Sequence, residues 1–160
     1  WCIFAIWGWG GAVGKFLRFC VIVICAVTGS TVVIPCEFAY PQSLRVETFM
    51  WCHNDVHCEQ PTHVCHSDNT NINADYWGRA ECLGDRVKNC ALKIKDIKDT
   101  DAGVYQFGFT SSYVTGISVG WPGVTLQVSV VNELYEPVVR LCKGSAVAPL
   151  NEVLNLNFSS

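Results

Sequence analysis

A chain of 160 residues with a formal net charge of −3 is long enough for one domain with a hydrophobic core and a shorter additional segment. Its eleven basic residues are scattered along the sequence, which excludes a nucleic-acid-binding surface built from clustered Lys and Arg. Ten cysteines favour an oxidising compartment, that is, the secretory pathway or the outer cell surface. We therefore expect a protein that is secreted or lies on the extracellular side of the plasma membrane.

The first 20 residues are strongly apolar but are interrupted by glycines and by Lys15 and Arg18. The uninterrupted apolar run Phe19–Val27 has the length of a signal-peptide core, whereas a membrane-spanning helix needs about 20 residues. Because the chain begins with Trp1, we expect a fragment whose residues 1–20 are a leader-like or misjoined segment. A membrane anchor would then lie outside this chain.

Short segments that alternate between apolar and polar residues follow in chain order. Residues 22–27 and 30–38 are rich in Val and Ile and are separated by a Gly-containing turn, and residues 103–109 and 123–130 also alternate. Residues 59–76 are polar and predict a loop, and residues 95–100 predict at most one helical turn. This pattern is typical of a β-sandwich.

Five residues occur at spacings typical of an immunoglobulin variable-type domain. Cys36 lies in an early strand, Trp51 lies on the next long strand, and Tyr105 follows the "DAG" of a tyrosine corner. Arg79 and Asp101 match the pair that forms a structural salt bridge in such domains. We therefore predict an all-β fold, an immunoglobulin V-type antiparallel sandwich of two sheets, over residues 21–131. Residues 132–160 would be a linker, the start of a second domain or a disordered end.

The usual disulfide between the two sheets cannot form, because Phe107 stands where the second cysteine normally follows the corner tyrosine. Cys90 opens the fifth strand of the predicted sandwich, which lies beside the strand of Cys36 in the same sheet. Opposed residues on neighbouring strands have Cα atoms about 4.5 to 5.5 Å apart, a distance that a disulfide bridges. We predict a Cys36–Cys90 disulfide within one sheet.

These features resemble the first domain of the sialic-acid-binding immunoglobulin-like lectins, or Siglecs. The resemblance rests on "GSTVVIPCEFAYP", on "GRAECLGDRVKNCALKIKDIKDTDAGVYQF" and on the Phe in place of cysteine, and it includes fish sequences described as B-cell-receptor-like Siglec homologues. In Siglecs the next residue is an Arg whose guanidinium binds the sialate carboxylate. Here that residue is Gly108, so the resemblance implies a domain that has lost arginine-dependent sialic acid binding. The candidate ligand face comprises Gly108, Phe109, Tyr113 and Trp121.

Further cysteines predict further disulfides. Cys52 and Cys58 lie on segments joined by a short turn, and this pair is similar to one in the polymeric immunoglobulin receptor and its relatives. Cys82 has two candidate partners, Cys25 and Cys65, and the sequence leaves both open. No partner is predicted for three others: Cys2, Cys20 and Cys142.

The stretch "CHNDVHCEQPTHVCH" also raises a metal site, because it holds three Cys and four His. Its cysteine intervals are longer than the two to four residues that zinc sites favour, so we expect solvated histidines beside disulfides and neither a metal nor another cofactor. We also expect no enzyme, because the disulfide pattern argues against a free, activated Cys nucleophile. Asn157 lies in the one N-glycosylation sequon of the sequence.

The sequence thus predicts an extracellular ligand-recognition domain of an immunoglobulin-superfamily receptor, Siglec-like and immune or adhesive in role. Its partner would be a cell-surface protein or a glycan, bound through the exposed face of the sheet that carries residues 103–109 and 123–130. Two alternatives remain open. One is a structural or adhesion domain that associates with itself, and the other is a Siglec-like lectin that uses other contacts.

Overall fold

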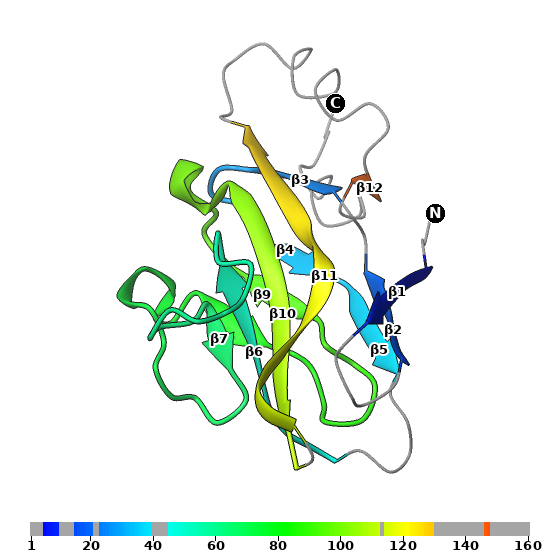
Figure 1. The fold of residues 1–160 in the computed structure, drawn as a ribbon. Coiled ribbons are helices and arrows are strands. Elements are labelled where there is room, and N and C mark those ends of the chain that lie inside the picture. The colour runs from blue at the N-terminus through cyan, green and yellow to red at the C-terminus, as the bar shows by residue number, and fades with distance from the viewer. Residues whose placement is uncertain are drawn as a thin grey trace, which may run out of the picture.

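The computed structural model describes residues 5–9, 15–20, 23–39, 45–112, 114–129 and 146–147, and its strands lie in two layers (Figure 1). Side chains are described from residue 23 onward, except those of Val114, Trp121, Pro122, Ala146 and Val147. In the described part of the chain the longest helical elements are two single 3-10 turns, and no helix is long and apolar enough to cross a membrane. The elements are β1 (Ala5–Trp9), β2 (Lys15–Cys20), β3 (Val23–Val27), β4 (Val32–Ile34), β5 (Cys36–Ala39), β6 (Val46–His53), β7 (Cys65–His66), η1 (Ala74–Tyr76), β8 (Ala80–Cys82), β9 (Leu92–Ile94), η2 (Asp99–Asp101), β10 (Gly103–Ser111), β11 (Val114–Ser129) and β12 (Ala146–Val147).

The larger sheet has the strand order β12-β3-β11-β10-β6-β7. β10 lies at its centre and pairs antiparallel with β6 and β11, so that Phe107 opposes Trp51 on one side and Gly120 on the other. β3 pairs with β11 in the parallel direction, which departs from the purely antiparallel sandwich that the sequence predicts. Side chains alternate along the long β10–β11 pair, so that one face points to the core and the other points away from it.

The second layer contains the three-stranded sheet β4-β9-β8 and the three-stranded sheet β1-β2-β5. β4 and β5 are separated in the chain by Pro35 alone, which has no N–H to donate to a ladder. The strand predicted over residues 30–38 is therefore divided, and its first half pairs with β9 while its second half pairs with β2. Asn89 bridges to Glu37 and keeps the chain before β9 alongside β5.

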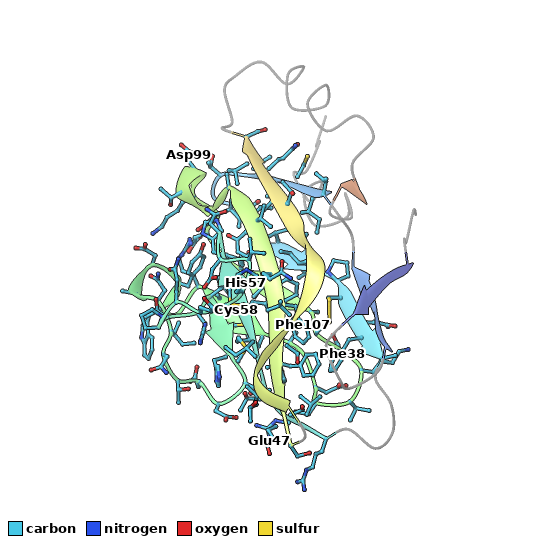
Figure 2. The ribbon with its side chains drawn as sticks, in the orientation of Figure 1. Phe38, Glu47, His57, Cys58, Asp99 and Phe107 are labelled. Atoms are coloured by element: carbon cyan, nitrogen blue, oxygen red, sulfur yellow. A yellow bond between two sulfur atoms is a disulfide. The ribbon has the colours of Figure 1, made fainter. Side chains whose placement is uncertain are left out.

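Aromatic rings fill the space between the layers. The Phe107 ring lies 5.3 Å from Phe38 and 5.6 Å from Trp51 (centroid to centroid), and both Phe residues are labelled in Figure 2. The Trp51 indole N–H donates to the Cys90 carbonyl oxygen at 2.8 Å, which satisfies the polar atom of a fully buried Trp. Phe107 therefore occupies the centre of the core, where the sequence places it instead of a cysteine.

The prediction of an all-β V-type sandwich is confirmed. The segment 95–100, for which at most one helical turn is predicted, overlaps the 3-10 turn η2, Asp99–Asp101, only in its last two residues. Residues 1–20 include the strands β1 and β2, of which β2 pairs with β5; the leader-like role predicted for this segment stays a prediction. Apart from β12, residues 132–160 lie outside the described residues, as does Asn157 with its sequon.

Candidate ligand-binding site

Three disulfides organise the site. Cys36 is joined to Cys90, with Cα atoms 4.9 Å apart, as the sequence predicts for neighbouring strands of one sheet. Cys52 is joined to Cys58, also as predicted.

The third disulfide joins Cys65 to Cys82. This settles the choice that the sequence leaves open and shows that the alternative Cys25–Cys82 pairing is wrong. The reason is topological. Cys65 and Cys82 lie on the edge strands β7 and β8, whereas Cys25 lies on β3, near the opposite end of the larger sheet from β7. Cys25 is itself disulfide-bonded, but not to any of the other cysteines among the described side chains. The side chains of Cys2, Cys20 and Cys142 also lie outside them.

The corner that precedes β10 is held by Arg79, Asp101 and Tyr105. Both terminal nitrogens of the Arg79 guanidinium donate to the Asp101 carboxylate, at distances of 2.8 and 2.9 Å, and Asp101 is only 2% exposed. The Tyr105 hydroxyl donates to the Asp101 carbonyl oxygen at 2.7 Å. Both the salt bridge and the tyrosine corner are present as predicted, and they fix the start of β10.

The outward face of β10 is covered at its centre. Met50, Cys52 and Cys58 form a second buried apolar cluster there, with Val119 packed against it. Gly108 lies beneath this cluster, and a Cβ atom at its position would lie 2.9 Å from an Ile117 methyl carbon. The same Cβ would lie 3.2 Å from the Met50 sulfur and 3.4 Å from the Cys58 sulfur. The side chains of Ile117 and Met50, together with the Cys58 sulfur, therefore occupy the space above Gly108 that a longer side chain would need.

The turn that carries Cys58 over the sheet is ordered by its own polar side chains. Asp55 accepts hydrogen bonds from the backbone N–H groups of His57 and Gln60, at 3.2 and 2.8 Å. Asn54 has a positive φ of 53° and accepts from the Val104 N–H at 3.0 Å, which ties the turn to β10. The cover above Gly108 is thus a built part of the domain.

The candidate ligand face predicted from the sequence needs correction. Phe109 is 3% exposed and stacks on Phe38 with ring centroids 6.1 Å apart, so it belongs to the core. Gly108 is buried under the second cluster. Strand alternation places Phe109 on the same face as the core residue Phe107, so its inclusion in the ligand face is wrong. For Gly108 the reason is different, because alternation identifies the outer face but not what covers it. Tyr113 lies outside the described residues, and so does the side chain of Trp121.

The metal alternative also meets a chemical obstacle. Cys52, Cys58 and Cys65 are all consumed in disulfides, so the thiolates that a zinc site would use do not exist. Within the described residues no three Cys, His, Asp or Glu side chains gather as metal ligands would. The imidazoles of His63 and His66 instead stack on each other, with centroids 5.6 Å apart.

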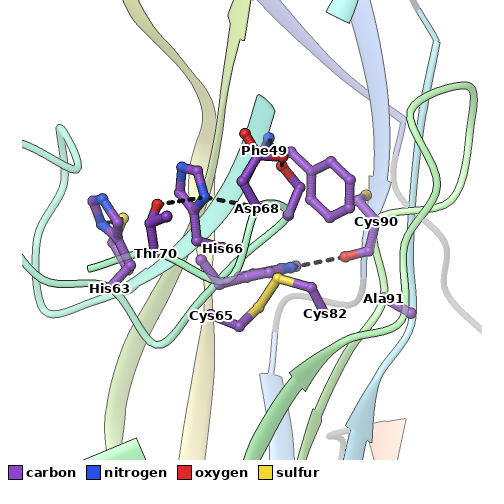
Figure 3. Close-up of a disulfide and its surroundings, with 12 residues drawn as sticks. Phe49, His63, Cys65, His66, Asp68, Thr70, Cys82, Cys90 and Ala91 are labelled. Carbon is purple, nitrogen blue, oxygen red and sulfur yellow. Dashed lines mark hydrogen bonds between the residues drawn. A yellow bond between two sulfur atoms is a disulfide. The ribbon is translucent and has the colours of Figure 1, made fainter. Parts of the chain in front are cut away.

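Burial lowers the pKa of both stacked histidines below their ordinary value of 6.5. For His63 the neighbouring His66 adds to the lowering, and for His66 the nearby Arg86 does so. The His66 Nδ1 accepts the Asp68 N–H at 3.2 Å (Figure 3), which favours the neutral ring with its proton on Nε2. These two histidines are therefore neutral at pH 7.

This arrangement predicts a pH-dependent stability. Because the folded pKa values lie below 6.5, the unfolded chain binds more protons in the window just under 6.5, and stability falls as the pH is lowered through it. We expect the Tm to fall between about pH 7.5 and about pH 5.5, measured by circular dichroism. The His63→Gln/His66→Gln double variant should lose most of this dependence, and His57→Gln, at an exposed position, should retain it. A wild-type Tm that is constant or rises on acidification would contradict the prediction.

A groove of about 590 Å³ opens between the edge strands β7 and β8. Phe49, Ile72 and the Cys65–Cys82 disulfide line its apolar part. Phe49 and the disulfide are labelled in Figure 3. Trp77 also lines the groove and is 68% exposed. The sequence does not predict this groove, because Phe49 and the lining residues between Cys65 and Arg86 come together only in the fold. The one local signal was the "DYWGR" stretch, which places an aromatic residue in a polar loop.

The fold, the buried salt bridge at the corner and the tyrosine corner together define an immunoglobulin-type binding domain. The family model of the immunoglobulin V-set domain matches residues 23–129, and the chain belongs to this family. It is therefore a domain of a binding class and not an enzyme, and domains of this kind are typically extracellular.

Two solved structures show the same fold. Murine CRIg is 17% identical with a TM-score of 0.58, and the match covers 72% of this chain and 99% of that chain. The human B7-H4 IgV-like domain is 18% identical with a TM-score of 0.52, and the match covers 71% of this chain and 96% of that chain.

Proposed function

We propose that this domain recognises a protein ligand as the extracellular module of an immunoglobulin-superfamily receptor with an immune or adhesive role. Its membership of the V-set family and its likeness in fold to murine CRIg and the human B7-H4 domain support this proposal. Its three disulfides between described cysteines suit an oxidising, extracellular setting.

We further propose that the domain is Siglec-like in architecture without arginine-dependent sialic acid binding. The observation that carries this proposal is Gly108 beneath the Cys52–Cys58 disulfide. In the Siglec family the corresponding Arg binds the sialate carboxylate, and losing such a charged hydrogen bond costs roughly 1.5 to 3 kcal/mol, about one to two decades in affinity. Here both the guanidinium and the open space for it are missing from the described face.

A glycan array tests the absence of sialic acid binding. The full 160-residue chain, oligomerised to raise its avidity, should give equal signals on sialylated glycans and on the same glycans after sialidase treatment. Binding that sialidase abolishes would overturn this part of the proposal and support a lectin that uses other contacts. Sedimentation at micromolar concentration separates the remaining alternative, because self-association without any heterologous ligand would favour a structural adhesion domain.

Restoring the Arg should not restore lectin activity. In Gly108→Arg, the new side chain must displace Ile117, Met50 or the Cys58 sulfur, and overpacking of this kind costs about 1 to 3 kcal/mol. We expect a lower denaturation midpoint in urea and no gain of sialylated-glycan binding on the array. Gly78→Arg is the matched control, because a Cβ there meets nothing within 4 Å, although its φ of +71° adds backbone strain. A stable Gly108→Arg variant that binds sialic acid would contradict the prediction.

A further inference from the structure

The groove between β7 and β8 lies where the two layers end. β7 is the last strand of the larger sheet and β8 is the last strand of the β4-β9-β8 sheet. The Cys65–Cys82 disulfide joins these two edges, with Cα atoms 5.6 Å apart. The layers are therefore tied covalently at this edge while a groove of about 590 Å³ remains open beside the bond, a size within the range of about 300 to 1,000 Å³ that ligand pockets have.

The groove combines an apolar floor with a rim that carries more carboxylates than cations. Glu81 and Asp85 line the rim, and backbone N–H donors, led by that of Lys88, lower the pKa of Asp85 and keep it ionised. The cation on the rim, Arg86, already forms a salt bridge with Asp68.

Glu81 is exposed and, within the described part of the chain, forms no salt bridge. Lys93 opposes it across the β8–β9 pair but does not line the groove. The described lining of the groove therefore holds two carboxylates and one guanidinium, which is already paired with Asp68.

Trp77 places an indole ring at the same rim. At 68% exposed it is, together with Val87, among the most exposed large apolar side chains of the described residues. A Trp face is the best aromatic partner for a cation, and Arg is the side chain that most often stacks there. An exposed Trp and a carboxylate that forms no salt bridge among the described residues line the same groove, and this combination suits a guanidinium on an apolar stem.

We propose that this groove binds an arginine side chain of a partner protein, with the guanidinium between Trp77 and Glu81 and the stem over the disulfide floor. The proposal rests on the proposed function, because it locates the ligand contact of the receptor domain at the β7–β8 edge. The covered face of β10 at Gly108 is then part of the scaffold. Trp and Arg pairs of this kind are frequent energetic centres of protein interfaces.

The test uses the full 160-residue chain labelled with ¹⁵N and the peptide acetyl-Gly-Leu-Arg-Leu-Gly-amide. We expect the indole N–H resonance of Trp77, assigned with Trp77→Phe, to shift with a Kd on the order of millimolar. The same peptide with citrulline, which keeps the shape of arginine without its charge, should bind about fivefold more weakly. A peptide with Glu in place of Arg should not shift the resonance at all.

Variants locate the contact. Glu81→Gln should weaken binding of the arginine peptide about threefold at low salt. Glu59→Gln, which removes an exposed carboxylate from the loop after Cys58 and not from the groove, should leave the Kd unchanged. Equal binding of the arginine and citrulline peptides, an unchanged Kd in Glu81→Gln, or shifts confined to β10 would each overturn the proposal.

The two proposals fail separately. If a cell-surface protein ligand binds the chain and Trp77→Ala keeps the wild-type affinity, the groove is not the contact and the receptor function stands. If the arginine peptide binds in the groove but no cell-surface protein binds the chain, the groove assignment stands and the receptor function is wrong.

Discussion

Replacing both Cys36 and Cys90 by Ala should lower the free energy of unfolding by about 4 kcal/mol. The bond closes a loop with a sequence separation of 54 residues, and on the chain-entropy model its main effect is to restrict the unfolded chain. Unfolding in guanidinium chloride, followed by tryptophan fluorescence, measures this loss. A loss of this size is a large fraction of the 5 to 15 kcal/mol that stabilises an ordinary domain.

The Cys52→Ala/Cys58→Ala variant is the matched control, because its loop has a separation of only 6 residues. The same model gives about 2 kcal/mol for this loop. If the two double variants lost equal stability, the large effect would not come from loop length. If the Cys36 variant lost nothing, the bond within the sheet would not be a structural support of the fold.

Phe107→Ala should cost about 3 to 5 kcal/mol, the range for removing a large aromatic side chain from a core. Phe107 is 1% exposed and its ring contacts four others, those of Phe38, Phe49, Trp51 and Phe109. The cavity would open between the two layers at their centre, where no disulfide crosses from β5 to β10. Equilibrium denaturation measures the loss.

Two further variants separate the cavity from other effects. Phe107→Leu keeps most of the volume and should cost clearly less than Phe107→Ala. Trp77→Ala removes a larger side chain from an exposed position and should change stability by less than about 0.5 kcal/mol. A small loss in Phe107→Ala would mean that the layers close over the gap, and the view that this ring replaces the missing inter-sheet bond would then be wrong.

The cover above Gly108 links two features that the sequence presents separately. The Cys52–Cys58 pair belongs to one segment of the sequence and Gly108 to another. In the structure the disulfide packs with Met50 directly over that Gly. Glycine is what this cover permits, because every larger residue would meet the sulfur or a neighbouring side chain.

The sequence by itself determined the features that depend on local pattern. Period-2 alternation identified β10 and the second half of β11. The spacing of Arg79, Asp101 and Tyr105 identified the corner that the structure shows. The Cys36–Cys90 bond followed as well, because Phe107 excludes the usual partner and adjacent strands lie at a fixed distance.

Only the tertiary structure decided what lies over each face and edge. Alternation assigns Gln106 and Gly108 to the outer face of β10, but both are buried there, because a turn from another strand folds over them. The choice of Cys65 as the partner of Cys82, and the groove beside their bond, likewise depend on which edge strands meet. Such contacts join residues far apart in the chain, and no local period encodes them.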